Sequence, residues 1–205
     1  AVIERCHYLP SISEPNQLIM KITTILSASC LLAGVANAAT IQTISATNSP
    51  SLEGWSVNLT SGDGAQNGEF SGDSASNGGG SSGAGAGATA WALYANSDPT
   101  AEAVYSPGGG ALTVGQAGAL AFDNGYVNTG GTVGVTFLNG GTEVLAFTFA
   151  GGDPNYAIFD GVTTDSGIGF TADGFNVALN LTASGAYSLN AGGNVFNGTL
   201  NNGQT

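Results

Sequence analysis

The chain has 205 residues and a formal net charge of −12, from 14 acidic residues against two basic ones. Both bases, Arg5 and Lys21, lie near the N-terminus, as do the one histidine, both cysteines and the one methionine. From residue 39 onward the chain therefore contains no Lys, Arg, His, Cys or Met. In that part the composition excludes histidine-assisted nucleophilic catalysis, cation-based phosphate or nucleic-acid binding, Cys/His zinc sites and disulfides.

Residues 20–38 are typical of a secretory signal peptide. Lys21 is its charged start, residues 22–35 form an apolar run, and a small-residue site ends at Ala38, after which we expect cleavage. We expect residues 1–19 to be upstream, non-native sequence, because Met20 fits an initiator and the composition changes there. No second run of about 18 apolar residues follows, so we expect no transmembrane segment in the mature chain.

Residues 39–205 are expected to form one domain that is truncated at its C-terminus, because the chain stops just after a strand-like segment. Glycine interrupts this part every few positions, and apolar residues alternate with polar ones between the interruptions. In chain order the pattern predicts strands at 54–60, 89–96, 102–105, 118–122, 132–138, 143–149, 155–160, 175–181 and 187–189. Turns at Asn139-Gly140-Gly141 and Ser184-Gly185 predict two hairpins. The sequence therefore predicts an all-β fold, a single antiparallel β-sandwich or jelly roll.

A low-complexity stretch at 61–88 is rich in Gly, Ser and Ala and carries a repeat of period ten. We expect a flexible surface loop there, because small side chains cannot form a core. The alternative is a calcium site at Asp63, Glu69 or Asp73, since calcium binds carboxylate oxygens. No other cofactor is expected.

Aromatic residues next to neutral polar ones are candidates for carbohydrate binding, because sugar rings stack on aromatic faces. In the strand predicted at 89–96, alternation places Trp91 inward with Leu93, and Tyr94 outward with Asn96. Tyr126 and Tyr156 each follow a polar, turn-like tripeptide. The candidate sugar-binding residues are thus Tyr94, Asn96, Tyr126 and Tyr156, and the competing interpretation is that the tyrosines are half-buried aromatics at strand ends.

Glu102 and Glu143 are the strand-borne acids that a carboxylate-based glycosidase would use. Such an enzyme needs two carboxyl groups separated by roughly 5–9.5 Å. Nothing in the sequence pairs these two acids, and solvated strand ends explain both. We therefore assign no catalytic residue and expect a protein that is not an enzyme.

Four blocks, 91–97, 123–134, 155–160 and 167–171, carry a resemblance to a known kind of protein. They resemble secreted Gly- and Asn-rich β-sandwich proteins of Verrucomicrobia and related bacteria, many of which bear a PEP-CTERM sorting tail. The resemblance implies export by the general secretory route and a place at the outer cell surface or in extracellular polymer. It implies no particular activity or functional residue, and the tail motif itself does not occur in this sequence.

The function expected from these observations is that of a non-enzymatic extracellular or cell-surface matrix protein that binds polysaccharide and no nucleic acid. Two alternatives stay open, a carboxylate-based glycan-active enzyme and a calcium-stabilised adhesin.

Overall fold

The computed structural model describes residues 2–3, 48–60, 67–73, 76, 89–95, 100–106, 112–173 and 175–201. The expected signal peptide with its cleavage site at Ala38 lies outside these residues, as do Asp63 and Asn96. Most of the described residues are in strands that form antiparallel, packed sheets, which confirms the predicted all-β sandwich. Across the described ranges, no helix is long and apolar enough to cross a membrane.

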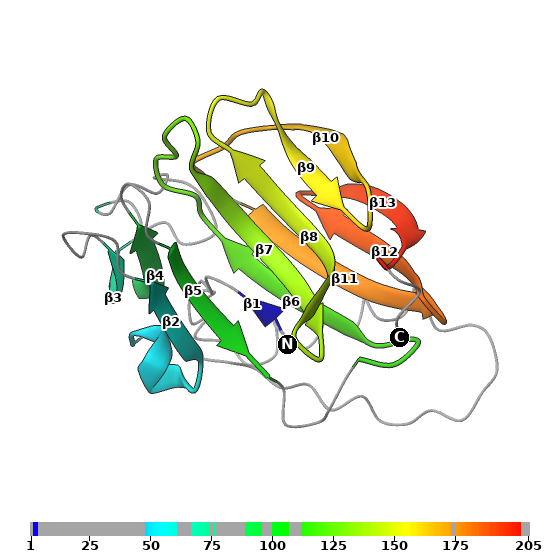
Figure 1. Cartoon of the computed structure of the whole chain (residues 1–205), viewed down its shortest axis with the longest axis horizontal. Helices are drawn as coiled ribbons and strands as arrows, with labels where there is room; N and C mark the ends of the chain where they lie inside the picture. Colours follow the sequence, from blue (N-terminus) through cyan, green and yellow to red (C-terminus); the bar gives the residue numbers. More distant parts are fainter. Residues whose placement is uncertain are drawn as a thin grey trace, which may run out of the picture.

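Two antiparallel sheets form the sandwich (Figure 1). The large sheet has the strand order β10-β9-β8-β7-β1-β5-β2, and the small sheet has the order β13-β12-β11-β6. The strands of the large sheet are β1 (Val2–Ile3), β2 (Ser56–Thr60), β5 (Thr100–Tyr105), β7 (Thr132–Asn139), β8 (Thr142–Ala150), β9 (Asn155–Phe159) and β10 (Thr163–Gly169). Those of the small sheet are β6 (Ala117–Phe122), β11 (Phe175–Ala183), β12 (Ala186–Ala191) and β13 (Asn194–Thr199).

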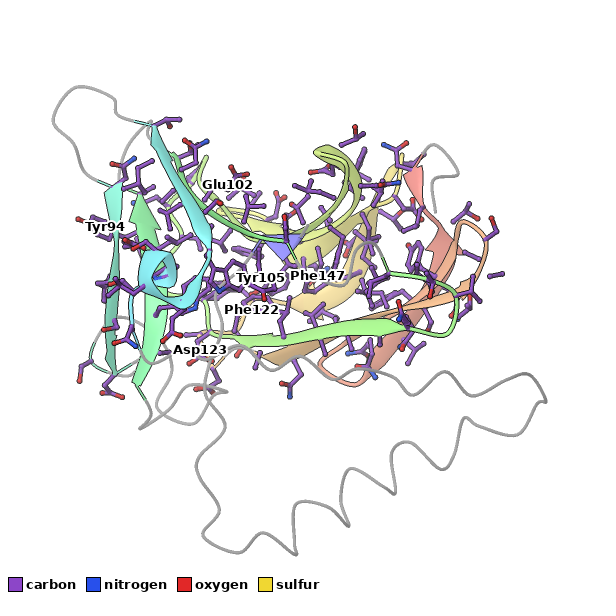
Figure 2. The ribbon with its side chains drawn as sticks, turned by 90° about the horizontal axis from the view of Figure 1, so that it is seen from below. Tyr94, Glu102, Tyr105, Phe122, Asp123 and Phe147 are labelled. Carbon is purple, nitrogen blue, oxygen red and sulfur yellow. The ribbon has the colours of Figure 1, made fainter. Side chains whose placement is uncertain are left out.

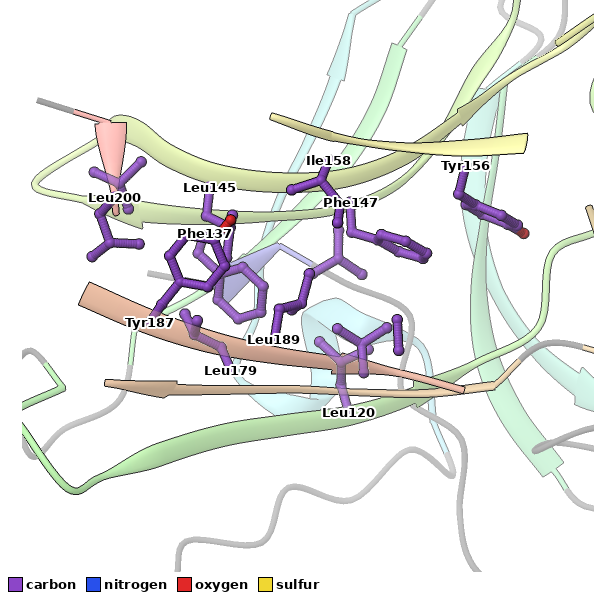
Figure 3. Packing of buried hydrophobic residues seen from close by; sticks show 14 of the residues in the cluster. Leu120, Phe137, Leu145, Phe147, Tyr156, Ile158, Leu179, Tyr187, Leu189 and Leu200 are labelled. Atoms are coloured by element: carbon purple, nitrogen blue, oxygen red, sulfur yellow. The ribbon is translucent and has the colours of Figure 1, made fainter. Parts of the chain in front are cut away.

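The main core lies between β7–β9 of the large sheet and β6, β11 and β12 of the small sheet (Figure 3). Its residues follow the alternation of the strands, so that one side chain in two points inward. A β-bulge in β8 is an exception, because Phe137 pairs with Leu145 while Leu138 pairs with Glu143. Val144 is the extra residue, and it is buried in the same core as Leu145.

The two predicted hairpins are confirmed, and glycine explains the turn of the first. β7 and β8 are joined by Gly140 and Gly141, whose φ angles are 57° and 88°. Positive φ at both positions is the requirement of the two-residue turn that matches strand twist. The second predicted hairpin corresponds to β11 and β12, which pair around Ser184 and Gly185.

A smaller layer packs at the β2–β5 end of the large sheet. It consists of a two-stranded sheet, β3 (Asn67–Asp73) with β4 (Thr89–Ala95), and a short 3-10 helix, η1 (Pro50–Glu53). Trp55, Trp91, Leu93 and Ala103 form its buried core, which we call the tryptophan cluster. The two indole rings meet edge to face, with centroids 5.0 Å apart.

The expectation of a loop across 61–88 is wrong at residues 67–73, which form β3. The physical reason is tertiary: the Asn67 side-chain Nδ2 donates to the backbone oxygens of Thr60 (2.7 Å) and Thr100 (2.8 Å). These bonds fasten β3 to the ends of β2 and β5. β1 and β10 are further strands that the sequence pattern did not predict, and β13 corresponds to the strand-like segment noted near the end of the chain.

Candidate functional site

The outward face of the β3–β4 sheet carries an aromatic pair, in which Tyr94 is exposed and Phe70 is half-buried. Tyr94 lies opposite Gly68, and Ala92 lies opposite Phe70. The Tyr94 side chain is 44% exposed, and its ring centroid is 6.2 Å from that of Phe70 at an interplanar angle of 53°. Figure 2 shows Tyr94 in the two-stranded β3–β4 sheet, at the end of the molecule away from Phe122 and Phe147 of the main core. The predicted outward position of Tyr94 is therefore confirmed.

Gly68 explains how the tyrosine ring lies on this sheet. A Cβ atom built on Gly68 would be 2.8 Å from Cε1 and 2.9 Å from the hydroxyl oxygen of Tyr94. The ring therefore covers the bare backbone of the neighbouring strand. On the opposite face of β4, Trp91 and Leu93 are buried, as their alternation predicts. Tyr94 and Phe70 together form an aromatic surface, which we call the aromatic face.

The candidate calcium ligands Glu69 and Asp73 accept hydrogen bonds from nearby serines. The Glu69 carboxylate accepts from the backbone N–H of Ser51 at 2.9 Å and from the Ser51 hydroxyl, which ties η1 to β3. Asp73 Oδ2 accepts from the backbone N–H (3.1 Å) and hydroxyl (2.7 Å) of Ser76. Asp63 lies outside the described residues. Among the residues that are described, no three Asp, Glu, His or Cys side chains are grouped to hold a metal.

Tyr156 is neither an exposed sugar-binding candidate nor a half-buried aromatic at a strand end, the two interpretations that the sequence left open. Its side chain is fully buried and stacks on Phe147, with centroids 4.9 Å apart and an interplanar angle of 6°. Its hydroxyl accepts a hydrogen bond from Nδ2 of Asn124. The expected strand at 155–160 is confirmed, but the tyrosine points inward from β9, so its ring offers no surface for a sugar (Figure 3).

Tyr126 is the most exposed of the candidate tyrosines, at 87%. It belongs to the segment between β6 and β7, which a close backbone crossing fixes in place. Gly131 accepts a bond from the backbone N–H of Gly151 at 2.9 Å, and the N–H of Gly130 donates to the oxygen of Gly151 at 3.3 Å. A Cβ on Gly151 would overlap the carbonyl group of Asn128. The crossing therefore depends on glycine at position 151.

Asp123 and Asn124 are buried polar residues at the start of this segment. The Asp-Asn-Gly tripeptide is typical of an exposed turn, so their burial was not predicted. The sequence pattern does not reveal the hydrogen-bond partner that permits this burial. The Asn124 amide is paired with Tyr156, which lies in a strand more than thirty residues away.

The two acids considered for glycosidase chemistry are not brought together. Glu143 is exposed at the start of β8, and Glu102 is half-buried on β5 (Figure 2). The strand order places β7 and β1 between these strands. Three strand spacings amount to roughly 14 Å, which exceeds the separations that glycosidase carboxylates use.

Two groups at the sheet ends have shifted pKa values. Burial, and then the hydrogen bond from its hydroxyl to Asp160 Oδ2 at 2.8 Å, raise the pKa of Tyr187 well above its usual range. The backbone N–H of Gly167 and the side-chain amide of Asn155 lower the pKa of the exposed Asp165 carboxyl.

Neither group adjoins the aromatic face in the sheet order, since Tyr187 belongs to the small sheet and Asp165 to β10. The aromatic face itself consists of two neutral side chains, Tyr94 and Phe70. The chain matches no protein-family model, no curated protein and no solved structure.

Proposed function

We propose that this protein is a non-enzymatic, secreted protein of a bacterial surface or extracellular matrix that binds polysaccharide through the aromatic face. The observation that carries the proposal is the half-exposed Tyr94 ring, which lies across Gly68 beside Phe70. An aromatic ring held on a rigid strand presents its outer side to a sugar ring without losing much side-chain freedom on binding.

Charge selects among polysaccharides. The described residues include no Lys, Arg or His, so the surface of this part of the chain carries acids alone. Uronic acids, sulfates and phosphates would meet like charge, whereas neutral sugars would not. We therefore propose a neutral glycan as the ligand, with Tyr94 and Phe70 supplying stacking contacts.

A glycan array probed with the full chain tests this proposal. We expect retention of neutral glycans, and we expect Tyr94→Ala to weaken the binding about tenfold, the magnitude of one lost aromatic contact. Gly68→Ala tests the position of the ring itself, because it keeps the tyrosine. The added Cβ would lie 2.8 Å from Tyr94 Cε1 and would displace the ring. Val114→Ala, at another exposed apolar residue, serves as the matched control.

The outcomes separate the candidate surfaces. Loss of retention with Tyr126→Ala but not with Tyr94→Ala would move the binding site to the segment between β6 and β7. Absence of retention of any glycan would refute polysaccharide binding. The secretion part is tested separately by mass spectrometry of the exported protein, where an N-terminus other than Ala39 would contradict the expected cleavage.

A further inference from the structure

β13 is a regular edge strand of the small sheet with no charged residue. It pairs with β12 alone, and the pairing runs without a register shift from Asn194 opposite Ala191 to Thr199 opposite Ala186. Its second edge therefore presents backbone N–H and C=O groups that no strand of the described chain covers. Such an edge is a template for pairing with another strand.

The direction of the unpaired donors follows from one hydrogen bond. The backbone N–H of Leu200 donates to the oxygen of Gly185 at 2.7 Å, so position 200 points its N–H toward the β12 side. Because N–H directions alternate along a strand, Gly198 and Phe196 also point toward β12. The N–H groups of Val195, Asn197 and Thr199 consequently point to the open edge.

The remaining edge strands, β10 and β2 of the large sheet and β6 of the small sheet, are less suited to pairing with another strand. β10 has a register shift between Asp165 and Gly169 and carries the exposed Asp165 carboxylate. β2 is joined at its end by β3, through the bonds of Asn67. β6 is regular but presents only alanines, 117, 119 and 121, beside its open edge, whereas β13 presents Val195, which is 57% exposed. Among the outward residues of these two edge strands, Val195 is the largest apolar side chain, so its burial would contribute more than that of any single alanine.

Charge also favours this side of the molecule. The outward positions of the small sheet contain only small apolar and neutral polar residues: Ala117, Ala119, Ala121, Asn176, Ala178, Asn180, Thr182, Ala186, Ser188, Asn190, Val195, Asn197 and Thr199. Two copies of an acidic protein repel each other, so their outward faces meet most favourably where they carry no carboxylate. On the inward side of β13, Asp160 lies against Gly198, where its carboxylate accepts a hydrogen bond from the Tyr187 hydroxyl.

We propose that β13 pairs antiparallel with β13 of a second copy of this chain, joining two small sheets into one continuous eight-stranded sheet. The register centred on Asn197 places each Asn197 opposite its equivalent and Val195 opposite Thr199 of the second copy. All three outward N–H groups of each chain then have a carbonyl opposite them, as in a hydrogen-bonded antiparallel pair. This pairing does not depend on the proposed glycan binding, because β13 and the β3–β4 sheet lie at opposite ends of the molecule (Figure 1).

Sedimentation equilibrium of the full chain, up to about 1 mM, measures the association. We expect a concentration-dependent dimer that strengthens with sodium chloride, because salt screens the repulsion between the acidic copies. Asn197→Asp places two carboxylates opposite each other and should weaken the dimer about tenfold at pH 7. The difference from wild type should disappear at pH 3, where carboxyl groups are mostly protonated.

Matched variants distinguish pairing through the β13 edge from contact through the outward face of the small sheet. Asn180→Asp adds the same charge to the same sheet face, on the interior strand β11, and should change the dimer constant less than about twofold. Asn197→Pro removes an outward donor without breaking the β12 ladder and should abolish the dimer, whereas Ala119→Pro on β6 should not. Circular dichroism of each variant verifies the fold.

Three results would overturn the proposal. The first is a wild-type protein that stays monomeric at the highest concentration in molar salt. The second is a dimer that Ala119→Pro abolishes and Asn197→Pro leaves intact, which would place the interface at β6. The third is an equal effect of Asn197→Asp and Asn180→Asp, which would indicate a face-to-face contact or general repulsion instead of edge pairing.

Discussion

The main core and the tryptophan cluster differ in whether the polar atoms of their buried aromatic side chains have hydrogen-bond partners. In the main core the hydroxyl of Tyr156 accepts a bond from Asn124, and the hydroxyl of Tyr187 donates to Asp160. In the tryptophan cluster the indole N–H groups of Trp55 and Trp91 are both buried, and neither has a hydrogen-bond partner within the described part of the chain.

The difference follows from the position of the polar atom of each ring. The tyrosine hydroxyls of the main core reach residues at the margin of the sheets, in the segment after β6 and at the end of β9. The indoles are packed against Leu93, Ala103 and other apolar side chains. Each unpaired buried donor costs about 1–3 kcal/mol, so the burial of the rings must outweigh this cost. The indole rings of the tryptophan cluster are therefore held by packing without a hydrogen bond from their N–H groups, whereas the tyrosine rings of the main core combine packing with a directed polar contact.

The largest expected effect comes from opening a cavity in the main core. Phe147→Ala should lower the free energy of unfolding by about 3–5 kcal/mol, because Phe147 is fully buried and stacks on Tyr156. Urea unfolding followed by tryptophan fluorescence measures it. Val162→Ala, at a largely exposed residue, should change stability by less than about 0.5 kcal/mol. A similar loss in both variants would mean that the main core does not dominate stability.

Removing one hydroxyl tests the polar contacts of the main core. Tyr156→Phe keeps the ring but leaves the buried Asn124 amide without its acceptor, so we expect a loss of about 1–3 kcal/mol in urea unfolding. Tyr126→Phe is the control, because that hydroxyl belongs to an exposed residue and its removal should be neutral. An unchanged stability of Tyr156→Phe would show that the Asn124 bond contributes nothing.

Salt should act on the protein as a whole, since every charged side chain among the described residues is acidic. Screening weakens their repulsion, so the melting temperature should rise by about 2–4 °C between dilute and molar sodium chloride, the change that roughly 1 kcal/mol produces. Differential scanning calorimetry measures it. A melting temperature that does not move would contradict the view that like charges destabilise the fold.

The matching change in the tryptophan cluster should have a smaller effect. Trp91→Phe removes apolar volume, which destabilises, but also removes an N–H group that has no partner, which stabilises. We expect the two effects to cancel within about 1 kcal/mol. A loss larger than that of Tyr156→Phe would indicate that the indole N–H is satisfied in solution and that the two regions do not differ.

The smallest expected effect is confined to high pH. The raised pKa of Tyr187 means that the folded state keeps this proton after the unfolded state has released it. The stabilisation is complete below the ordinary tyrosine pKa of about 10 and is lost as pH rises above it. Melting temperatures between pH 8 and 11 should fall less steeply for Tyr187→Phe than for wild type. Parallel curves would exclude a contribution from this residue.

The sequence pattern predicted the elements whose inward and outward sides differ clearly. Alternation in β7 and β8, with Asn139-Gly140-Gly141 between them, is enough to define a hairpin and its buried face. The same rule placed Trp91 inward and Tyr94 outward. The role of Gly68 could not be predicted, because it depends on the register that sets this glycine opposite Tyr94.

The failures have tertiary causes. β3 consists largely of Gly, Ser, Asn and acidic residues with low strand propensity, and it is held by β4 and by the bonds of Asn67 and Glu69. The strand that contains Tyr156 was predicted, but the side that the tyrosine faces depends on its contacts with Phe147 and Asn124, which lie far from it in the sequence. Neither the bonds that hold β3 nor the contacts that turn Tyr156 inward can be predicted from the residues next to them in the sequence.

The shortest strand has the widest structural consequence. β1 contributes two residues, and within the described chain it alone connects β7 to β5, pairing antiparallel with both. Removal of residues 2–3, as the expected cleavage after Ala38 would bring about, leaves two parallel backbone rows facing each other across the width of one strand. A processed molecule would keep a continuous large sheet only if another extended segment took the place of β1 between β7 and β5.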